Sequence, residues 1–397
     1  MKRFTTIRYT GAAIAAIIGV IAALNYLRPL PTVTASADSL SAQLGAPTLT
    51  WPVAGQAAVG ASGYGVLDSS GEQTKLATAS VAKIITALAV LKRKPLSANE
   101  QGPTITISDS DVAIYNKYVA EQGSVVAVTS GERITEYEAL QAMLLPSANN
   151  IADSLAIWAF GSMDAYQAYA TQMVQALGLT QTTIGSDASG YAPDTVSTAV
   201  DLVRLGEAAM QNQVIADVVD QPSASLPVVG TVHNVDTILG VNGIIGIKTG
   251  NNDQDTGVFL LAATHTLSNG QHVTIISAVM GQGSLNGAFI ASESLLRSAK
   301  AAFAVETPVV AGQKLATYTV PWAKSVTAVA QSPLSIAAWQ GSVTMPHIQL
   351  DTIHGGLASG AQVGTVSATA GTNRVSSAIV LKSAIPSPSF WWRLTRH

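Results

Sequence analysis

Two residues that could do chemistry together are Ser80 and Lys83, which stand three positions apart. A mostly apolar run at residues 84–91 follows them and predicts a helix. In such a helix the serine lies in the first turn, and the lysine lies one turn further on the same face. A serine beside a lysine that can lose its proton is a candidate nucleophile with its base. The same pair is also typical of an ordinary helix start, with an N-cap serine and a solvated lysine.

Two more short motifs with reactive side chains follow along the chain. One is Ser-Ala-Asn after Pro146, in a loop between two predicted helices, and the other is Lys-Thr-Gly, which ends an apolar strand predicted for residues 244–250. Each is weak alone, because loop serines and asparagines are commonly turn or capping residues. Together, and in this order, the motifs match the set of class A β-lactamases and penicillin-binding proteins. They are Ser80-x-x-Lys83, Ser147-x-Asn149 and Lys248-Thr249-Gly250.

The wider sequence resembles the D-alanyl-D-alanine carboxypeptidase family, the low-molecular-mass penicillin-binding proteins, over roughly residues 57–394. The resemblance implies an α+β fold: a penicillin-binding-protein or β-lactamase-like transpeptidase domain, an antiparallel sheet with helices, followed by a small all-β domain. It also implies a peptidoglycan stem peptide as substrate, acylation of Ser80 by β-lactams, and a bacterial location at the outer face of the cytoplasmic membrane or in the cell wall. The stretches that carry the resemblance beyond the first motif are residues 144–152, 189–191, 197–202 and 246–250.

The chemistry of these motifs requires a lysine base, because none of them contains a histidine. Lysine normally titrates at about 10.4, so it must be desolvated or placed near positive charge to be neutral near pH 7. Lys248 supplies that charge if the fold brings it near Lys83. We expect Ser80 to attack the carbonyl of the penultimate D-Ala and Lys83 to take its proton. Ser147 is expected to relay a proton to the leaving amine, after which water hydrolyses the acyl-enzyme.

The other motif residues are expected to bind the substrate. Asn149 can hydrogen-bond the substrate amide or hold the lysine base. Lys248, Thr249 and Gly250 are expected to line the site, with the first two placed for the substrate carboxylate. The backbone N–H groups of the nucleophile and of Asn251 are expected to hold the oxyanion, a role whose removal typically costs ~10²–10³ in rate in other enzymes.

Two positions depart from the family pattern. Asn251 follows the third motif, where family members often have an aromatic residue or a histidine. Many members carry an arginine near the start of the helix after the last strands, but the matching position is Ala288, and residues 281–294 contain no basic residue. Carboxylate recognition would then rest on Lys248 and Thr249 alone, which weakens the expectation of a strict preference for a free D-Ala terminus.

Three alternatives to a carboxypeptidase remain open. A class A β-lactamase uses a glutamate for deacylation, and no glutamate stands between positions 139 and 206. A DD-endopeptidase or weak transpeptidase would use the same serine, and the residues do not separate it from a carboxypeptidase. A non-catalytic cell-wall binding protein on this fold is opposed by the intact motifs.

Composition excludes several other classes. The 397 residues carry a net charge of −3 with only 11% charged residues and no basic patch, so nucleic acid is not an expected partner. Cysteine is absent, and the six histidines are scattered without ligand spacing, so neither a metal nor a cofactor is expected.

The elements that position the motifs follow an α+β pattern, with strands at both ends of the region and helices between them. The last hairpin is therefore expected to join the first in one antiparallel sheet. Strands are predicted for residues 57–76 (a hairpin with its turn at 68–72), 104–107, 125–128, 258–263 and 273–279. Helices are predicted for residues 136–145 (with a Thr135/Glu138 capping box), 150–160, 165–177, 197–210 (capped by Ser197) and 292–303.

The chain divides into five predicted parts. Residues 1–37 combine basic residues, an apolar stretch and an Ala-x-Ala cleavage candidate, which indicates a signal peptide or an N-terminal membrane anchor plus the start of a linker. Either reading exports the bulk of the chain. Residues 38–56 continue the linker, 57–304 form the catalytic serine peptidase domain, and 305–385 form the all-β domain. Residues 386–397 are an aromatic-basic tail suited to a membrane interface, although a disordered or packed tail is equally compatible. The β domain's predicted strands are 314–320, 325–330, 342–345, 348–350, 362–367 and 377–381.

Overall fold

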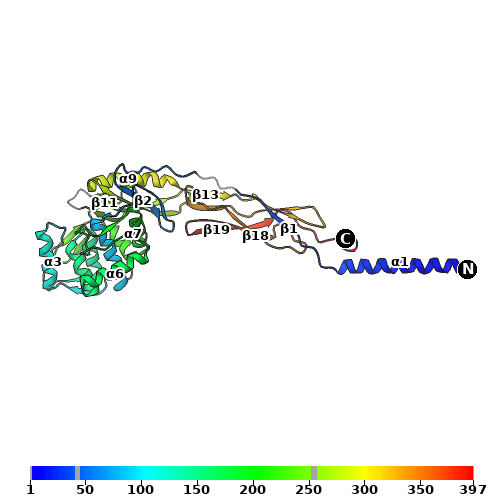
Figure 1. Cartoon of the computed structure of the whole chain (residues 1–397), viewed down its shortest axis with the longest axis horizontal. Coiled ribbons are helices and arrows are strands. Elements are labelled where there is room, and N and C mark those ends of the chain that lie inside the picture. Colours follow the sequence, from blue (N-terminus) through cyan, green and yellow to red (C-terminus); the bar gives the residue numbers. More distant parts are fainter. Residues whose placement is uncertain (1, 41–44, 252–256, 397) are drawn as a thin grey trace. The chain divides into compact units, whose positions relative to one another are not determined.

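The computed structural model describes residues 2–40, 45–251 and 257–396. The chain forms two compact units, one of residues 46–304 and one that joins residues 1–45 to residues 305–397 (Figure 1). All three sequence motifs lie in the first unit. Each unit is described separately below.

The first unit is built on a five-stranded antiparallel sheet with the order β10-β11-β12-β2-β3. In its centre, Ala278 lies opposite Ala58, so the strand that ends the last hairpin pairs with the strand that begins the first. This pairing confirms that both hairpins share one sheet. The strands are β2 (Gln56–Ala61), β3 (Gly65–Ser70), β10 (Ile244–Gly250), β11 (Gly257–Thr266) and β12 (His272–Gln282).

Helices cover both faces of this sheet. Ala278 of β12 belongs to the same buried cluster as Leu202 of α7 (Ala199–Gln211). The next residue, Val279, packs instead with Leu295 of α9 (Leu285–Ala302). Successive side chains of a strand point to opposite faces, so α7 and α9 lie on opposite sides of the sheet.

The remaining helices gather around α2 (Ala82–Arg93), whose residues 82–91 are all buried. A helix that is apolar all round needs neighbours on every side, and α4, α5, α6 and α7 all pack against it. The other helices are α3 (Asp109–Ala120), α4 (Glu136–Leu144), α5 (Asn149–Phe160), α6 (Met163–Ala176) and α8 (Gln213–Val219). Short strands pair as β4 (Leu76–Ala77) with β7 (Val196–Ser197), β5 (Thr104–Thr106) with β6 (Arg133–Thr135), and β8 (Ser223–Leu226) with β9 (Gly230–His233).

The turn of the first hairpin was predicted wrongly. It lies at residues 62–64, where the Tyr64 N–H donates to the Ala61 carbonyl at 2.9 Å. Asp68, predicted to be in the turn, lies opposite Val59 within the ladder. The physical reason is that β3 is an edge strand with exposed positions, so its polar residues face solvent and imitate a turn in the sequence.

The predicted strand at residues 125–128 does not form. Its backbone is hydrogen-bonded instead by the side chain of Asn150, whose Oδ1 accepts from the Val126 N–H at 3.1 Å and whose Nδ2 donates to the Val126 carbonyl at 2.9 Å. A side-chain amide therefore takes the place of a neighbouring strand. The apolar residues still pack inward, since Val126 is buried.

Helix starts were partly predicted. The capping box at α4 is confirmed, with the Glu138 N–H donating to Thr135 Oγ1 at 3.2 Å and the Thr135 N–H donating to Glu138 Oε2 at 2.7 Å. Thr198 rather than Ser197 caps α7, because Ser197 belongs to β7. Helix α9 begins at Leu285 instead of residue 292, and its cap is Ser284. The glycines of that first turn resemble a loop in sequence.

The second unit contains a six-stranded sheet with the order β1-β14-β15-β19-β18-β17 and a separate β13-β16 pair. Its first strand, β1, comes from the region predicted to be a linker, and it pairs with β14 so that Ala35 lies opposite Tyr318. The predicted strand at 342–345 is absent from the described structure of this segment. The strands are β1 (Thr34–Ala37), β13 (Phe303–Val309), β14 (Lys314–Thr319), β15 (Val326–Ala330), β16 (Leu334–Trp339), β17 (His347–Leu350), β18 (Gln362–Ala370) and β19 (Asn373–Leu381).

Helices stand at both ends of the chain and belong to this second unit. They are α1 (Lys2–Leu27) and α10 (Phe390–Thr395). Among the residues described, none of the helices combines the length and the apolar character needed to cross a membrane.

Candidate active site

Ser80 sits in a 3₁₀ turn, Ala79–Val81, that leads directly into α2. The turn is closed by the Val81 N–H, which donates to the Thr78 carbonyl at 3.2 Å. Ala79 has a φ of 45°, a left-handed conformation that residues with a side chain rarely adopt. The Ser80 hydroxyl is therefore carried by a tight, strained turn at the start of a rigid buried helix.

Lys83 lies in the first turn of α2 and is fully buried. Its Nζ is 2.8 Å from Ser80 Oγ, 2.7 Å from Asn149 Oδ1 and 3.0 Å from the Ser189 carbonyl oxygen. The first and second motifs thus meet at one nitrogen atom.

The chemistry of these contacts depends on the protonation of Lys83. A neutral amine has two N–H donors and one lone pair, whereas an ammonium has three donors and no lone pair. The oxygens of Asn149 and Ser189 can only accept, so they occupy both donors of the neutral amine. The lone pair then faces Ser80 Oγ, which can donate its hydrogen. When Lys83 is neutral, this arrangement therefore allows it to take a proton from this serine.

The second motif bridges α4 and α5. Asn149 begins α5, and its N–H donates to the Ser124 carbonyl at 2.8 Å. A Cβ at Gly123 would lie only 2.7 Å from Asn149 Nδ2, so a glycine is required beside this amide. Ser147 is 5% exposed and has a φ of 65°. Within the described chain its hydroxyl makes no hydrogen bond, so the structure does not connect it to Lys83.

The third motif lies on β10. Lys248 and Thr249 are buried, and Lys248 Nζ donates to the Thr249 carbonyl at 3.1 Å. A Cβ at Gly250 would lie 2.8 Å from the Thr78 carbonyl, so the glycine allows β10 to approach the turn that carries Ser80. Asn251 follows and is exposed. It is the last residue described before residue 257.

Residues 189–191 were part of the family resemblance, but the sequence did not show that their loop contacts Lys83. Ser189 presents its carbonyl to the lysine, and Asp187 fixes the loop by accepting hydrogen bonds from five groups. A Cβ at Gly190 would lie 2.1 Å from the Ala79 carbonyl, so this loop packs closely against the Ser80 turn. The Asp-x-Ser-Gly pattern is a signal for such a turn. The donors to Asp187 are the backbone N–H groups of Ser189, Gly190, Tyr191 and Ala192 and the Ser189 hydroxyl.

A second carboxylate supports the same loop. Asp153 of α5 accepts from the Ala188 N–H at 2.9 Å and from the Tyr118 hydroxyl at 2.8 Å. Burial raises the pKa of Asp153, and these two hydrogen bonds act in the opposite direction. The tyrosine therefore links α3 to the loop beneath Lys83.

The electrostatics favour a neutral Lys83. Burial lowers the pKa of Lys83 well below its usual value, and the positive charge of Lys248 lowers it further. The carboxylates of Asp187 and Asp153 raise it and so partly oppose these effects. The structure thus brings Lys248 near enough to Lys83 for the charge effect expected from the sequence.

Lys248 has a carboxylate of its own nearby. Burial lowers the pKa of Lys248 to about 7, and Asp236 partly offsets this by raising it. Burial in turn raises the pKa of Asp236 to about 6, and its Oδ2 is buried without a hydrogen-bond partner in the described structure. The turn of Asp236 is tied to the second motif, because the Val235 N–H donates to the Leu145 carbonyl at 3.0 Å.

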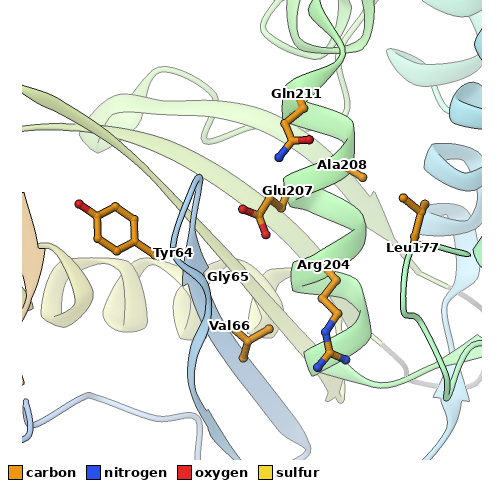
Figure 2. Close-up of a pocket in the computed structure, with 8 residues that line it drawn as sticks. All are labelled: Tyr64, Gly65, Val66, Leu177, Arg204, Glu207, Ala208 and Gln211. Carbon is orange, nitrogen blue, oxygen red and sulfur yellow. The ribbon is translucent and has the colours of Figure 1, made fainter. Parts of the chain in front are cut away.

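A separate hollow of about 560 Å³ lies between the β2–β3 hairpin and α7, and it contains none of the motif residues (Figure 2). Two of its charged side chains already have partners: Glu207 Oε1 accepts from the Gly63 N–H at 3.0 Å, and Arg204 pairs with Asp201 at 2.9 Å. These contacts hold the hairpin to α7. Among the described residues, no group of three or more potential metal ligands gathers anywhere.

The fold defines a class of protein. The Streptomyces K15 DD-transpeptidase superposes with a TM-score of 0.55 at 22% identity, over 64% of this chain and 98% of that one. Penicillin-binding protein 3 of Streptococcus pneumoniae, described as a peptidoglycan synthesis regulatory factor, superposes with a TM-score of 0.62 at 18% identity, over 85% of this chain and 100% of that one. The fold is therefore that of penicillin-binding proteins of the DD-peptidase type, followed by an all-β region, as the sequence predicted.

The chain belongs to the D-alanyl-D-alanine carboxypeptidase family, whose sequence model matches residues 56–284. It is 28% identical over 254 residues to the D-alanyl-D-alanine carboxypeptidase DacA of Escherichia coli K12, a match that covers 61% of this chain and 59% of that protein. It is 35% identical over 144 residues to DacB2 of Mycobacterium tuberculosis, covering 35% of this chain and 49% of that protein. The family resemblance read from the motifs is thereby confirmed, while the matches span about half to three fifths of these relatives.

Proposed function

We propose that this chain is a serine-type D-Ala-D-Ala carboxypeptidase that removes the terminal D-Ala from peptidoglycan stem peptides through an acyl-enzyme on Ser80. The observation that carries the proposal is the contact set of Lys83 Nζ, in which two obligate acceptors leave the lone pair for Ser80 Oγ. Membership of the carboxypeptidase family supports the choice of substrate.

In the proposed reaction, Ser80 Oγ attacks the carbonyl carbon of the penultimate D-Ala as Lys83 takes the hydroxyl proton. The backbone N–H groups of Ser80 and Asn251 bind the oxyanion. When the tetrahedral intermediate collapses, the C–N bond breaks and the proton reaches the leaving amine through Ser147. Lys83 then takes a proton from water as the water oxygen attacks the ester carbonyl. When the C–Oγ bond breaks, Lys83 returns that proton to Ser80 Oγ and the shortened peptide leaves.

Substrate recognition is assigned to the third motif. Lys248 and Thr249 are proposed to bind the terminal carboxylate, and Asn149 the amide of the scissile bond. A β-lactam carries a carboxylate near a reactive amide, so it is expected to bind in the same way and acylate Ser80. The proposed location is the outer face of the bacterial cytoplasmic membrane or the cell wall, where peptidoglycan lies, with the membrane contacted through the N-terminal segment and the C-terminal tail.

The test is release of D-Ala from a pentapeptide that ends in D-Ala-D-Ala, together with labelling by a fluorescent penicillin. Wild type is expected to release D-Ala and to carry the label on Ser80, and Ser80→Ala is expected to do neither. D-Ala release by a correctly folded Ser80→Ala protein would contradict the proposal. Absence of labelling in wild type would favour a non-catalytic binding protein, and rapid nitrocefin hydrolysis would favour a β-lactamase.

A DD-endopeptidase or transpeptidase is the second candidate, favoured by one observation. Ala288 lies buried in the first turn of α9, at the position where a basic residue was expected for carboxylate binding. With less recognition of a free terminus, cross-linked peptides or amine acceptors become better substrates. Mass spectrometry of products from cross-linked muropeptides separates the two activities.

A further inference from the structure

The N-terminal helix α1 leaves its apolar side chains in solvent. Seven large apolar residues between Ile14 and Leu27 are each more than half exposed. At about 100° per residue they cover roughly half of the helix surface, and Ala and Gly occupy the remaining positions of residues 11–23. A helix that is apolar all round is stable only when something apolar surrounds it. The exposed residues are Ile14, Ile17, Ile18, Val20, Ile21, Leu24 and Leu27.

The two ends of the chain also share an unusual charge. Residues 1–37 and 386–397 together contain six basic residues and no acidic one, in a chain whose net charge is −3. Basic segments of this kind are attracted to anionic lipid by about 1 kcal/mol per Lys or Arg near the surface. The charge of the two ends therefore complements an anionic lipid surface.

Arg396, after α10, closes the end of α1. Its Nε and Nη2 donate to the Asn25 carbonyl at 2.9 and 2.7 Å, and its Nη1 donates to the Pro29 carbonyl at 3.1 Å. Nη2 also donates to the Arg28 carbonyl. The last carbonyls of a helix have no partner within it, so the planar guanidinium satisfies groups that would otherwise need water.

The two helices also meet through aromatic rings. The Tyr26 ring of α1 is 5.6 Å from the Phe390 ring, and the Arg393 guanidinium lies 5.0 Å over Tyr26. Helix α10 also contacts the rest of the second unit, because the Trp392 ring is 5.6 Å from the Trp322 ring. Phe390 and Trp391 keep 59% and 73% of their surface exposed, and Phe390 contacts α1 through Tyr26. Figure 1 shows the C-terminus beside the end of α1.

The segment after α1 is part of the folded unit. The cleavage candidate at residues 35–37 lies inside β1, where Ala35 pairs with Tyr318 and Ala37 with Ala316 of β14. Cleavage there would remove an edge strand and separate α10 from α1. The sequence left cleavage and retention equally open, and these contacts favour retention.

From these contacts we propose that the two ends of the chain form one anchoring element for an anionic lipid surface, in which Arg396 fastens α10 to the retained helix α1. The apolar side chains of α1, with Phe390 and Trp391, enter the lipid, and the arginines lie at its headgroups. The inference is independent of the catalytic proposal, so D-Ala release is not expected to change when the element is disrupted.

Flotation of full-length protein with vesicles tests the fastening. Wild type is expected to bind vesicles that contain phosphatidylglycerol and to bind pure phosphatidylcholine weakly. Arg396→Lys keeps the charge but loses the planar fork, and it is expected to weaken binding nearly as much as Arg396→Ala, by about fivefold. Arg374→Ala, which removes the same charge from β19, is expected to have no effect. Binding of Arg396→Lys equal to wild type would overturn the role of Arg396.

Cross-linking tests the contact itself, because the chain contains no cysteine. Tyr26→Cys with Phe390→Cys, treated with a short bismaleimide after isolation from membranes, is expected to give an internal cross-link that Arg396→Ala reduces. The cross-link requires that α1 is retained. The proposal would be overturned if the isolated protein began after residue 37. It would also be overturned if the cross-link formed only between two chains, because the apolar face would then bind a second copy.

Discussion

The two buried lysines of the site have opposite surroundings. Lys83 is held by a hydroxyl, an amide oxygen and a backbone carbonyl from three different elements. The hydrogen bonds of Lys248 are to its own neighbour Thr249, and the carboxylate of Asp236 raises its pKa. Lys83 is therefore held in one position by hydrogen bonds to other elements, whereas Asp236 acts on Lys248 through its charge.

The roles proposed for the two lysines would make use of this difference. A base must meet one proton at one distance, so fixed hydrogen bonds are useful to Lys83. A carboxylate-binding group must remain charged and must keep a donor for the substrate, so few internal bonds are useful to Lys248. The same burial lowers the pKa of both, and only their neighbours separate the two roles.

The largest expected effect comes from making Lys83 permanently charged. Lys83→Arg cannot accept a proton near pH 7, so penicillin acylation is expected to fall by ~10³ or more, as it should for Lys83→Gln. The measurement is the second-order rate of acylation by a fluorescent penicillin. Lys92→Arg, in the last turn of the same helix, serves as the control. An active Lys83→Arg enzyme would show that Lys83 is not the base.

The substitution of lysine by arginine is expected to cost less activity at Lys248 than at Lys83. Lys248→Arg retains the positive charge and should lose less activity than Lys248→Gln, for which a loss of ~10² is expected from the missing carboxylate contact. The readout is kcat/KM for D-Ala release. Equal losses for the two variants would show that charge is not what Lys248 contributes.

Neighbouring asparagines offer a third comparison. Asn149→Ala removes an acceptor from Lys83 and is expected to slow acylation by ~10–10² while the melting temperature changes little. Asn150→Ala removes both hydrogen bonds to Val126 and is expected to lower stability by about 1–3 kcal/mol, with a smaller effect on acylation of the folded protein. Denaturant unfolding curves and acylation rates of both variants test these assignments. A larger loss of stability in Asn149→Ala and a larger loss of acylation in Asn150→Ala would contradict them.

The smallest expected effect concerns pH. Asp236 raises the pKa of Lys248, so Asp236→Asn should lower that pKa and move the alkaline limb of the kcat/KM profile to lower pH. Activity at about pH 8 is expected to fall two- to fivefold, with less change at about pH 6. A uniform loss across pH would indicate a purely structural role for Asp236.

Much of this site could be predicted from local sequence, because each motif is short and its own side chains form the site. The capping box of α4 was readable because both partners lie within one turn. The pairing of β12 with β2 followed from the order of strands and helices. The roles assigned to Ser147 and Asn251 stay predictions.

What could not be predicted depends on contacts between distant segments. The oxygen of Ser189 that accepts from Lys83 is a backbone carbonyl, and every residue type has one, so the sequence could not identify it. Its position depends on Asp187 and Gly190. Residues 125–128 have a strand's composition, yet the backbone N–H and carbonyl of Val126 are satisfied by Asn150, over twenty positions away. The N-terminal origin of β1 was equally hidden, because its partner β14 is almost three hundred residues away.

The strained backbone at Ala79 and Ser147 has a consequence for the melting temperature. Ala79 and Ser147 both hold left-handed φ angles, each at an expense of about 1–3 kcal/mol for a residue with a side chain. Glycine at either position would relieve that strain, so variants selected for a higher melting temperature are expected to accumulate there. Glycine at position 79 would also loosen the turn that carries Ser80, and glycine at position 147 would remove the hydroxyl proposed to relay a proton. Such thermostable variants should therefore turn over substrate more slowly.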